Sequence, residues 1–327
     1  MREWMIAAIA GLGVTAQPPA APAPAPAPAP AAEPETLGYG EDVASRMTVP
    51  VMVDGRGPYR FVVDTGAERT VLSRELADEL GLADSGSALL TSVTDVRTVP
   101  TVSVGQLGMG RRSVHTLQTP ILAQRNIGAQ GLLGIDSLRD MRVDLDFERG
   151  EMHLSRLRLA SGRPGDGSMT VRGGDGTIVV RGMTRYGRMI IADASVDGER
   201  VRVVVDTGSA VTIGNNALRE RLAGRDRNAP SQPIELLSVT GGTLRLDYTR
   251  TRHVRIGGAH LLNLPIGYAD VRLFRELGLE NRPAILLGMD ALRLFRRVSI
   301  DFSTRRLRLV PGPHSHLGGP IRLAAAR

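Results

Sequence analysis

Two apolar runs in the chain are each followed directly by the same three residues, Asp-Thr-Gly. The run "FVV" leads into Asp64 and the run "VVV" leads into Asp206, and Thr-Gly follows each aspartate. Short runs of β-branched and aromatic residues predict buried strands, and the glycine predicts a tight turn directly after each strand. We therefore expect two buried strands, each with an aspartate at its end.

The residues that follow the two aspartates also repeat. Ser73 and Asn215 stand at the same distance from them, and both predict helix N-caps. Further along, "LLGIDSL" (132–138) and "LLGMDAL" (286–292) occur in the same order, each before an alternating hairpin. This recurrence predicts two lobes built from one β-rich unit, with an additional helix over 271–279 in the second lobe.

The composition of the chain ends separates them from these lobes. A basic residue, a short apolar core and small residues before position 17 predict a secretory signal peptide, with an uncleaved anchor or a disordered N-terminus as the alternatives. The alternating Ala-Pro stretch that follows predicts a polyproline-type linker. The expected organisation is a signal peptide at 1–16, a linker at 17–36, an N-terminal lobe at 37–160, a Gly-rich connector at 161–176, a C-terminal lobe at 177–311 and a flexible tail at 312–327.

The charge of the chain does not favour nucleic-acid binding. The net charge is +7, but the 41 basic residues, all arginine, are scattered among 34 acidic ones, and aromatic residues make up only 3%. Base-stacking platforms need more aromatic side chains than this. No segment after the signal peptide is long and apolar enough to cross a bilayer, so we expect no stable membrane insertion after its cleavage.

The sequence favours neither a metal nor an organic cofactor, and for "HSH" (314–316) a disordered tail is preferred over a weak metal site. It has no cysteine, which excludes a disulfide framework and Cys-ligated zinc. The histidines outside the tail occur singly and are expected at surface or satisfied core positions: His115, His153, His253 and His260. Asp144 and Asp146 alternate on a predicted strand and are expected to face solvent.

A carboxylate at the end of a buried strand needs a chemical reason. Burial alone would raise its pKa, and two such carboxylates brought together by a pseudo-twofold axis between lobes would share one proton. For a single Asp-Thr-Gly, an ordinary Asx-turn is an equally good interpretation. The presence of two copies, each followed by the same elements, favours the paired site.

Taken together, these motifs resemble the pepsin and retropepsin clan of aspartic peptidases. The resemblance rests on "DTGA" (64–67) and "DTGS" (206–209), each followed by an apolar-apolar-Gly segment and a short helix, and it covers nearly all of residues 45–310. Each lobe is near the size of a retropepsin, so the chain resembles a bacterial protein with a duplicated retropepsin-like unit. The resemblance implies a mostly β, bilobal acid protease fold with two pseudo-twofold-related β lobes and short helices.

The resemblance also implies roles for individual residues. Asp64 and Asp206 would be the catalytic pair, acting as base and acid toward a shared water. The residues that support this dyad would be Thr65 and Thr207, with hydroxyls that cross between the loops, Gly66 and Gly208, which let N–H groups approach the carboxylates, and Ala67 and Ser209. The flaps that close over substrate would comprise Ser92, Val93, Thr94, Asp95, Val239, Thr240, Gly241 and Gly242, without the flap-tip tyrosine of pepsins.

One difference between the two motifs yields a further prediction. In the family, a hydroxyl at the position of Ser209 can donate to the adjacent carboxylate and favour its charged form. Ala67 lacks that hydroxyl. We therefore predict that Asp206 is ionised more often than Asp64, and that activity extends toward neutral pH.

The expected function is that of an exported aspartic-type endopeptidase that hydrolyses peptide bonds in the periplasm of a Gram-negative bacterium. Its partner would be a protein or peptide substrate in extended conformation, bound in a cleft between the lobes. A monomer is expected, because both aspartates lie on one chain. The alternative is a non-catalytic peptide- or cell-wall-binding protein that retains the fold.

Overall fold

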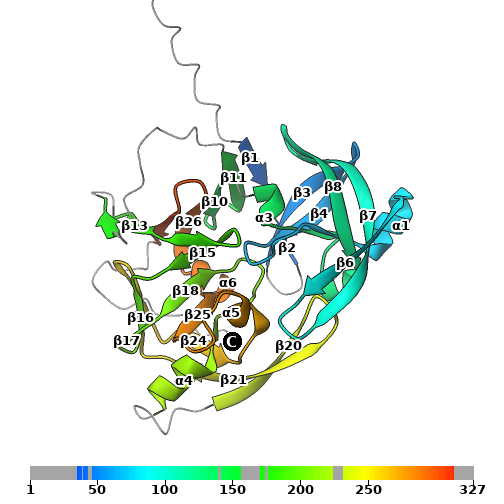
Figure 1. Cartoon of the computed structure of the whole chain (residues 1–327). Coiled ribbons are helices and arrows are strands. Elements are labelled where there is room, and N and C mark those ends of the chain that lie inside the picture. Colours follow the sequence, from blue (N-terminus) through cyan, green and yellow to red (C-terminus); the bar gives the residue numbers. More distant parts are fainter. Residues whose placement is uncertain are drawn as a thin grey trace, which may run out of the picture. The chain divides into compact units, whose positions relative to one another are not determined.

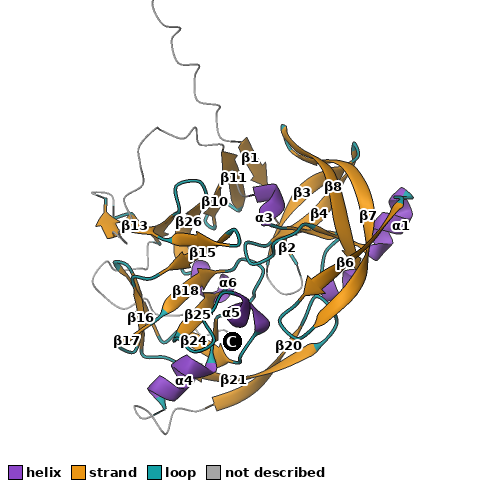
Figure 2. Ribbon diagram, in the orientation of Figure 1, coloured by secondary structure: helices purple, strands orange, loops and turns teal. Residues whose placement is uncertain are grey.

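The computed structural model describes residues 35–38, 40–42, 46–138, 141–155, 170–173, 176–223 and 231–312. Strands predominate in these residues, and the helices are short (Figure 2). The expected mostly β, bilobal acid protease fold is confirmed. The expected signal peptide, most of the linker and nearly all of the tail lie outside the described residues.

The first lobe is built on one sheet, drawn from blue to green in Figure 1. Its central strands are buried where the apolar runs predict: β3 is largely buried, the last three residues of β4 are buried, and β9 is buried throughout. The strands are, in spatial order, β2 (Gly40–Glu41), β3 (Met47–Val53), β4 (Arg56–Val63), β9 (Gly131–Leu133), β5 (Val71–Ser73), β8 (Arg112–Leu122), β7 (Val96–Met109) and β6 (Asp84–Thr91).

The second lobe repeats this sheet. From β15 to β20 the strand order corresponds, position for position, to the order from β3 to β6 in the first lobe. The strands are, in spatial order, β14 (Met183–Arg185), β15 (Arg188–Ile191), β18 (Arg202–Val205), β25 (Ala284–Leu287), β19 (Ile213–Gly214), β24 (Pro265–Tyr268), β21 (Thr243–Arg250) and β20 (Ser231–Leu237). The internal repeat seen in the sequence is therefore a repeat of topology.

A parallel pair of strands lies at the centre of each sheet. In the first lobe β4 pairs with β9, with Val62 opposite Leu132, and in the second lobe β18 pairs with β25, with Val204 opposite Leu286. All four side chains are buried, as is usual for parallel strands covered on both faces. The strands β4 and β18 are the apolar runs that end at the two aspartates, so the aspartates leave the sheets at equivalent points.

A third sheet joins the lobes. Strand β10 from the first half pairs antiparallel with β26 from the second, with Val143 opposite Ile300. The strands are, in spatial order, β1 (Glu35–Gly38), β11 (Glu151–Ser155), β10 (Arg142–Asp146), β26 (Phe295–Asp301), β27 (Arg306–Pro311), β13 (Ile178–Arg181) and β12 (Thr170–Arg172). Two of these strands begin before the lobes as the sequence delimits them, because β1 starts inside the expected linker and β12 lies inside the expected connector.

A small sheet of four strands completes the β structure of the described residues. The strands are β17 (Glu199–Arg200), β16 (Ala194–Val196), β22 (His253–Ile256) and β23 (Ala259–Leu262). His253 and His260 lie on the two strands of its hairpin, where His253 stands opposite Leu262 and His260 opposite Arg255. Their rings are nearly parallel with centroids 4.9 Å apart, and a hydrogen bond of 2.7 Å joins His253 Nε2 and His260 Nδ1. These two histidines therefore form a hydrogen-bonded pair, although they occur singly in the sequence.

The helices follow the capping signals of the sequence. The helix α1 (Arg74–Leu80) begins after Ser73, whose hydroxyl accepts the Leu76 amide, and α4 (Asn216–Leu222) begins after Asn215, whose side chain accepts the Leu218 amide. The additional helix of the second lobe is confirmed as α5 (Arg272–Glu276). The others are α2 (Gln124–Ile127), α3 (Ile135–Leu138) and α6 (Met289–Leu292).

The core contains two aspartates that the sequence places at the surface. Asp144 and Asp146 are 6% and 1% exposed, contrary to expectation. Each is paired: Arg142 donates to Asp144 at 2.7 Å, and Arg297 of β26 donates to Asp146 at 2.6 Å. Although burial alone would raise the pKa of Asp146, the bonds from Arg297 and Arg149 hold it below its usual range. A lone hairpin would leave these side chains in water, but β10 also pairs with β26, which places Arg297 opposite Asp146.

No helix within the described ranges has the length and apolar character needed to cross a membrane.

Candidate active site

Asp64 and Asp206 come together where the two central strands end. Asp64 follows β4 and Asp206 follows β18, and the amide of each donates to the "LLG" strand of its own lobe, to Leu133 at 3.0 Å and Leu287 at 3.1 Å. Asp206 is 8% exposed. A methyl group on Gly66 of the first loop would lie 2.5 Å from a carboxylate oxygen of Asp206. The carboxylate of each lobe therefore lies against the loop of the other.

The glycines of the two loops are required by this close approach. A side chain at Gly66 would overlap the Asp206 carboxylate, and one at Gly208 would overlap the Asp64 carboxylate. Without side chains, the loops fold back on their own aspartates. The amides of Gly66 and Ala67 donate to Asp64 at 2.8 and 2.9 Å, and the Gly208 amide donates to Asp206 at 2.9 Å. Both carboxylates are thus fixed by backbone donors.

The threonines of the two loops cross between the lobes. The Thr65 hydroxyl donates to the Val205 carbonyl at 3.0 Å, and the Thr207 hydroxyl donates to the Val63 carbonyl at 2.7 Å. Each hydroxyl in turn accepts the backbone amide of the other threonine, at 3.0 and 3.1 Å. Both side chains are buried. The two aspartate loops are therefore locked to each other by four reciprocal bonds that water does not reach.

A second pair of polar contacts anchors each loop to the helix below it. In the first lobe Asp136 accepts the Thr70 hydroxyl, and in the second lobe Asp290 accepts the Thr212 hydroxyl, both at 2.7 Å. The same threonine hydroxyls accept the amides of the glycines that end the two "LLG" strands. Burial raises the pKa of Asp290. The "LLG" glycines lie against the backbone that follows the aspartate loops, Gly134 at Arg69 and Gly288 at Val211.

The electrostatics of the site distinguish the two acids. Burial raises the pKa of Asp206, the charge of Asp64 raises it further, and together they bring it to about 7. Burial also raises the pKa of Asp64, but bonds from the Gly66 and Ala67 amides and the charges of Arg46 and Arg188 oppose that rise. The two acids therefore share one proton, and the negative charge of Asp64 favours its position on Asp206.

This assignment reverses the prediction made from Ser209. The Ser209 hydroxyl donates to the Val211 carbonyl at 2.7 Å instead of to a carboxylate. Only the backbone amide of Ser209 acts on Asp206, lowering its pKa slightly against the larger effects of burial and of Asp64. The sequence could not reveal this, because a serine hydroxyl at the end of a tight turn has backbone carbonyls and a side-chain carboxylate within equal reach.

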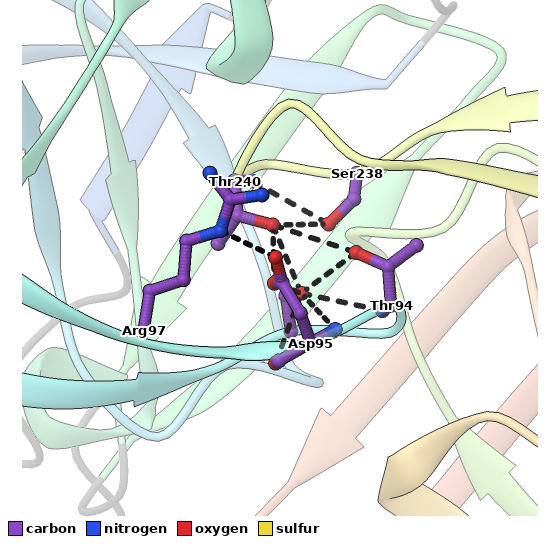
Figure 3. A network of polar contacts seen from close by, with 6 residues as sticks. Thr94, Asp95, Arg97, Ser238 and Thr240 are labelled. Carbon is purple, nitrogen blue, oxygen red and sulfur yellow. Dashed lines mark hydrogen bonds and ion pairs between the residues drawn. The ribbon is translucent and has the colours of Figure 1, made fainter.

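The two expected flaps meet at their tips (Figure 3). One tip is the turn between β6 and β7, and the other is the turn between β20 and β21. The Thr240 hydroxyl lies 3.0 Å from the Ser92 hydroxyl and donates to the Asp95 carboxylate at 2.7 Å. Arg97 forms an ion pair with the same carboxylate, and Ser238 contacts Thr240. The tips are therefore joined by a polar cluster, which we call the tip cluster: Ser92, Thr94, Asp95, Arg97, Ser238 and Thr240.

Apolar contacts cross between the lobes beside the tip cluster. Val93 of the first flap packs against a second-lobe group that includes Val204 and Ile213, whereas Val239 of the second flap packs against a first-lobe group that includes Val62. Gly242 allows the tips to approach, since a methyl group there would lie 2.6 Å from the Thr94 hydroxyl. The eight expected flap residues thus lie in two turns that contact each other and the opposite lobes.

Two residues of the site were missed by sequence reasoning. Arg46 and Arg188 are 8% and 6% exposed, and their charges act on the carboxylates of the dyad. The signal was present: an Arg-Met pair precedes each aspartate by the same number of residues, at 46–47 and 188–189. It belongs to the same internal repeat, extended toward the N-terminus of each half.

Comparison with protein families agrees with this architecture. The family model of the aspartyl proteases matches residues 49–137 and 192–291, which together make up more than half of the chain. Each matched region contains one Asp-Thr-Gly loop, as expected for a duplicated retropepsin-like protein. The chain belongs to the aspartyl protease family, which supports a proteolytic activity. No curated protein matches it.

Proposed function

We propose that this protein is an aspartic endopeptidase in which Asp64 and Asp206 form one catalytic dyad. The observation that carries the proposal is the packing of each buried carboxylate against the aspartate loop of the other lobe, in a family of proteases. Two acids this close hold a single proton between them, which is the property that the dyad of aspartic proteases uses.

The charge distribution supports a division of labour between the acids. Asp64, with two backbone donors to its carboxylate, would accept a proton from the attacking water. Asp206, protonated below about pH 7, would donate a hydrogen bond to the substrate carbonyl and stabilise the developing oxyanion. Proton transfer to the leaving amine would return the dyad to its starting state. Activity is therefore expected to reach neutral pH and to fall as Asp206 ionises.

The substrate would be a peptide in extended conformation, held between the dyad and the two flap turns. An extended chain offers its main-chain groups to strands on both sides, which suits a site walled by β structure. Both aspartates lie on one chain, so a monomer suffices for catalysis. The sequence of residues 1–16 further supports export to the periplasm, where the linker would hold the protease away from a membrane or wall.

A cleavage assay tests this proposal. Purified full-length protein is incubated with an unfolded protein substrate across pH 4–8, and the products are identified by mass spectrometry. We expect internal cleavage that a statine-type inhibitor blocks, and a loss of at least about 100-fold in Asp206→Asn. Binding of peptides without cleavage by the wild-type protein would instead identify a non-catalytic peptide- or wall-binding protein.

A further inference from the structure

Two buried arginines cross between the lobes in the same way as the threonines. Arg188 begins β15 of the second lobe, and its Nε donates to the carbonyl of Gly66 in the first aspartate loop at 2.6 Å. Arg46 precedes β3 of the first lobe, and its Nη1 lies 3.5 Å from the carbonyl of Gly208 in the second loop. Each arginine therefore contacts the loop that carries the aspartate of the other lobe.

The peptide group that accepts the Arg188 bond also reaches the dyad. The Gly66 carbonyl and the Ala67 amide belong to one peptide unit, and the Ala67 amide donates to Asp64 at 2.9 Å. A cation on the carbonyl side polarises such a unit and strengthens its N–H as a donor. The positive charge of Arg188 is thus relayed through one peptide to the Asp64 carboxylate. The Gly208 carbonyl and the Ser209 amide form the corresponding unit beside Asp206.

The two relays differ in strength. Arg46 is held by Asp42, which its Nε contacts at 2.8 Å, and by the Ile127 carbonyl, so it approaches Gly208 only at 3.5 Å. Arg188 has no such close acid among the residues described: Glu68 is 3.9 Å away with a side chain 57% exposed. The shorter bond, from the arginine whose paired acid is more distant and more exposed, is therefore the one to the loop of Asp64.

We propose that Arg188 is a positioning residue that stabilises the negative charge of the dyad through the aspartate loop of the first lobe. The proposal rests on the dyad function stated above. It gives a buried cation, which is costly in an apolar interior unless it has a partner, a role in the reaction. The charged groups around the site are Asp64 and Asp206 of the dyad and the arginines Arg46 and Arg188. Asp42 pairs with Arg46, and Glu68 pairs with Arg188.

The test compares pH profiles of kcat/KM for the wild type, Arg188→Gln and Arg188→Lys, using the full chain. Removing the cation destabilises the ionised dyad, so both limbs of the Arg188→Gln profile should move upward, by about one pH unit. Lysine keeps the charge, so the Arg188→Lys profile should stay within a few tenths of a unit of wild type. Arg185→Gln is the matched control: it removes a guanidinium bond to the Leu277 carbonyl away from the dyad and should leave the profile unchanged.

A role in folding alone would lower the thermal midpoint of Arg188→Gln without moving the profile, and that result would overturn the proposal. If Arg188→Gln does not fold, the pH profile of Arg188→Lys is the test. A profile close to wild type supports a role for the positive charge, and a profile shifted by a full pH unit contradicts it. Carboxyl carbon NMR titration of the dyad keeps this test separate from the proposed function. A wild-type protein that does not cleave peptides would refute the protease, while an upward shift of the titration in Arg188→Gln would still support the role of Arg188 in stabilising the charge of the dyad.

Discussion

The threonines between the aspartate loops connect geometry to stability at the scale of single residues. The Thr207 hydroxyl is the acceptor for the buried Thr65 amide and the donor to the Val63 carbonyl. Neither group can find water in its place. The hydroxyl of Thr207 therefore helps to hold the two lobes in alignment. Substitution by valine would remove it with little change in side-chain shape.

We expect Thr207→Val to reduce the free energy of unfolding by about 1–3 kcal/mol, because the Thr65 amide is left buried without an acceptor. The reaction should slow as well, since the loops that carry the dyad lose their alignment. Thr207→Ser retains the hydroxyl and should stay close to wild type in both respects. Urea unfolding and kcat/KM measure the two effects, and a valine variant with wild-type values would show that the crossed bonds are not needed.

At this scale the sequence predicted which residues gather at the site and failed on how one of them bonds. Asp64, Asp206 and the two threonines could be predicted because they belong to one motif that occurs twice in the sequence. The Ser209 hydroxyl depends on a choice between nearby acceptors that only the local backbone decides, and it donates to Val211. The two arginines lie outside the motif and become significant only when the lobes pack.

The flap turns show what two elements gain by meeting. Each tip is a short polar turn, and together they bury the hydroxyl of Thr240 against an anion, Asp95. The bond from Ser92, together with those from Thr240 and Arg97, holds the pKa of Asp95 below its usual range, in spite of burial. Because the pKa of Asp95 is lowered in the folded state, these bonds add to the stability of the folded protein above about pH 4. That added stability is lost as the pH falls through the lowered pKa.

We expect Asp95→Asn to loosen the contact between the tips, because asparagine cannot offer an anion to Thr240 and Arg97. Backbone amides of 92–95 and 238–242 should exchange with deuterium several-fold faster in this variant at pH 7, while those of the central strands stay unchanged. Asp84→Asn, an exposed substitution at the far end of β6, is the control. Equal exchange at the tips of wild type and Asp95→Asn would mean that the apolar contacts of Val93 and Val239 alone hold them.

The elements themselves were largely predictable, because period-2 alternation, N-caps and glycine stops act locally. The helices α1 and α4 begin directly after the capping residues Ser73 and Asn215, and α5 lies within the segment where an added helix was expected. What the sequence could not give is the pairing of β10 with β26. That pairing joins segments far apart in the chain, and it buries Asp144 and Asp146 on a face that looked polar.

The whole molecule carries the energetic consequence of the site. Asp206 keeps its proton to about pH 7 in the folded state, whereas an aspartate in the unfolded chain releases it near pH 4. Between these values the folded protein binds more protons than the unfolded one, so its stability falls as the pH rises. The dyad is thus a source of instability near neutral pH that the packing of the sheets must offset.

We expect Asp206→Asn to be more stable than wild type at pH 8, with a smaller difference at pH 4, where both chains are neutral at this position. The thermal midpoint measured at the two pH values gives the comparison. Asp78→Asn, which removes an exposed carboxylate from α1, should show no such difference. A gain in Asp206→Asn that is equal at both pH values would contradict a proton held on Asp206.

The central claim is that two lobes of one chain supply a single catalytic unit, and a double-variant series tests it most directly. The measurement is kcat/KM for wild type, Asp64→Asn, Asp206→Asn and the double variant on one peptide substrate. When two residues act as a unit, removing either one abolishes the contribution of both. The kcat/KM of each single variant should therefore fall by at least about 100-fold, and that of the double variant should fall no further than that of the worse single variant. A single variant that cleaves at the wild-type rate, or losses that multiply in the double variant, would contradict the shared dyad.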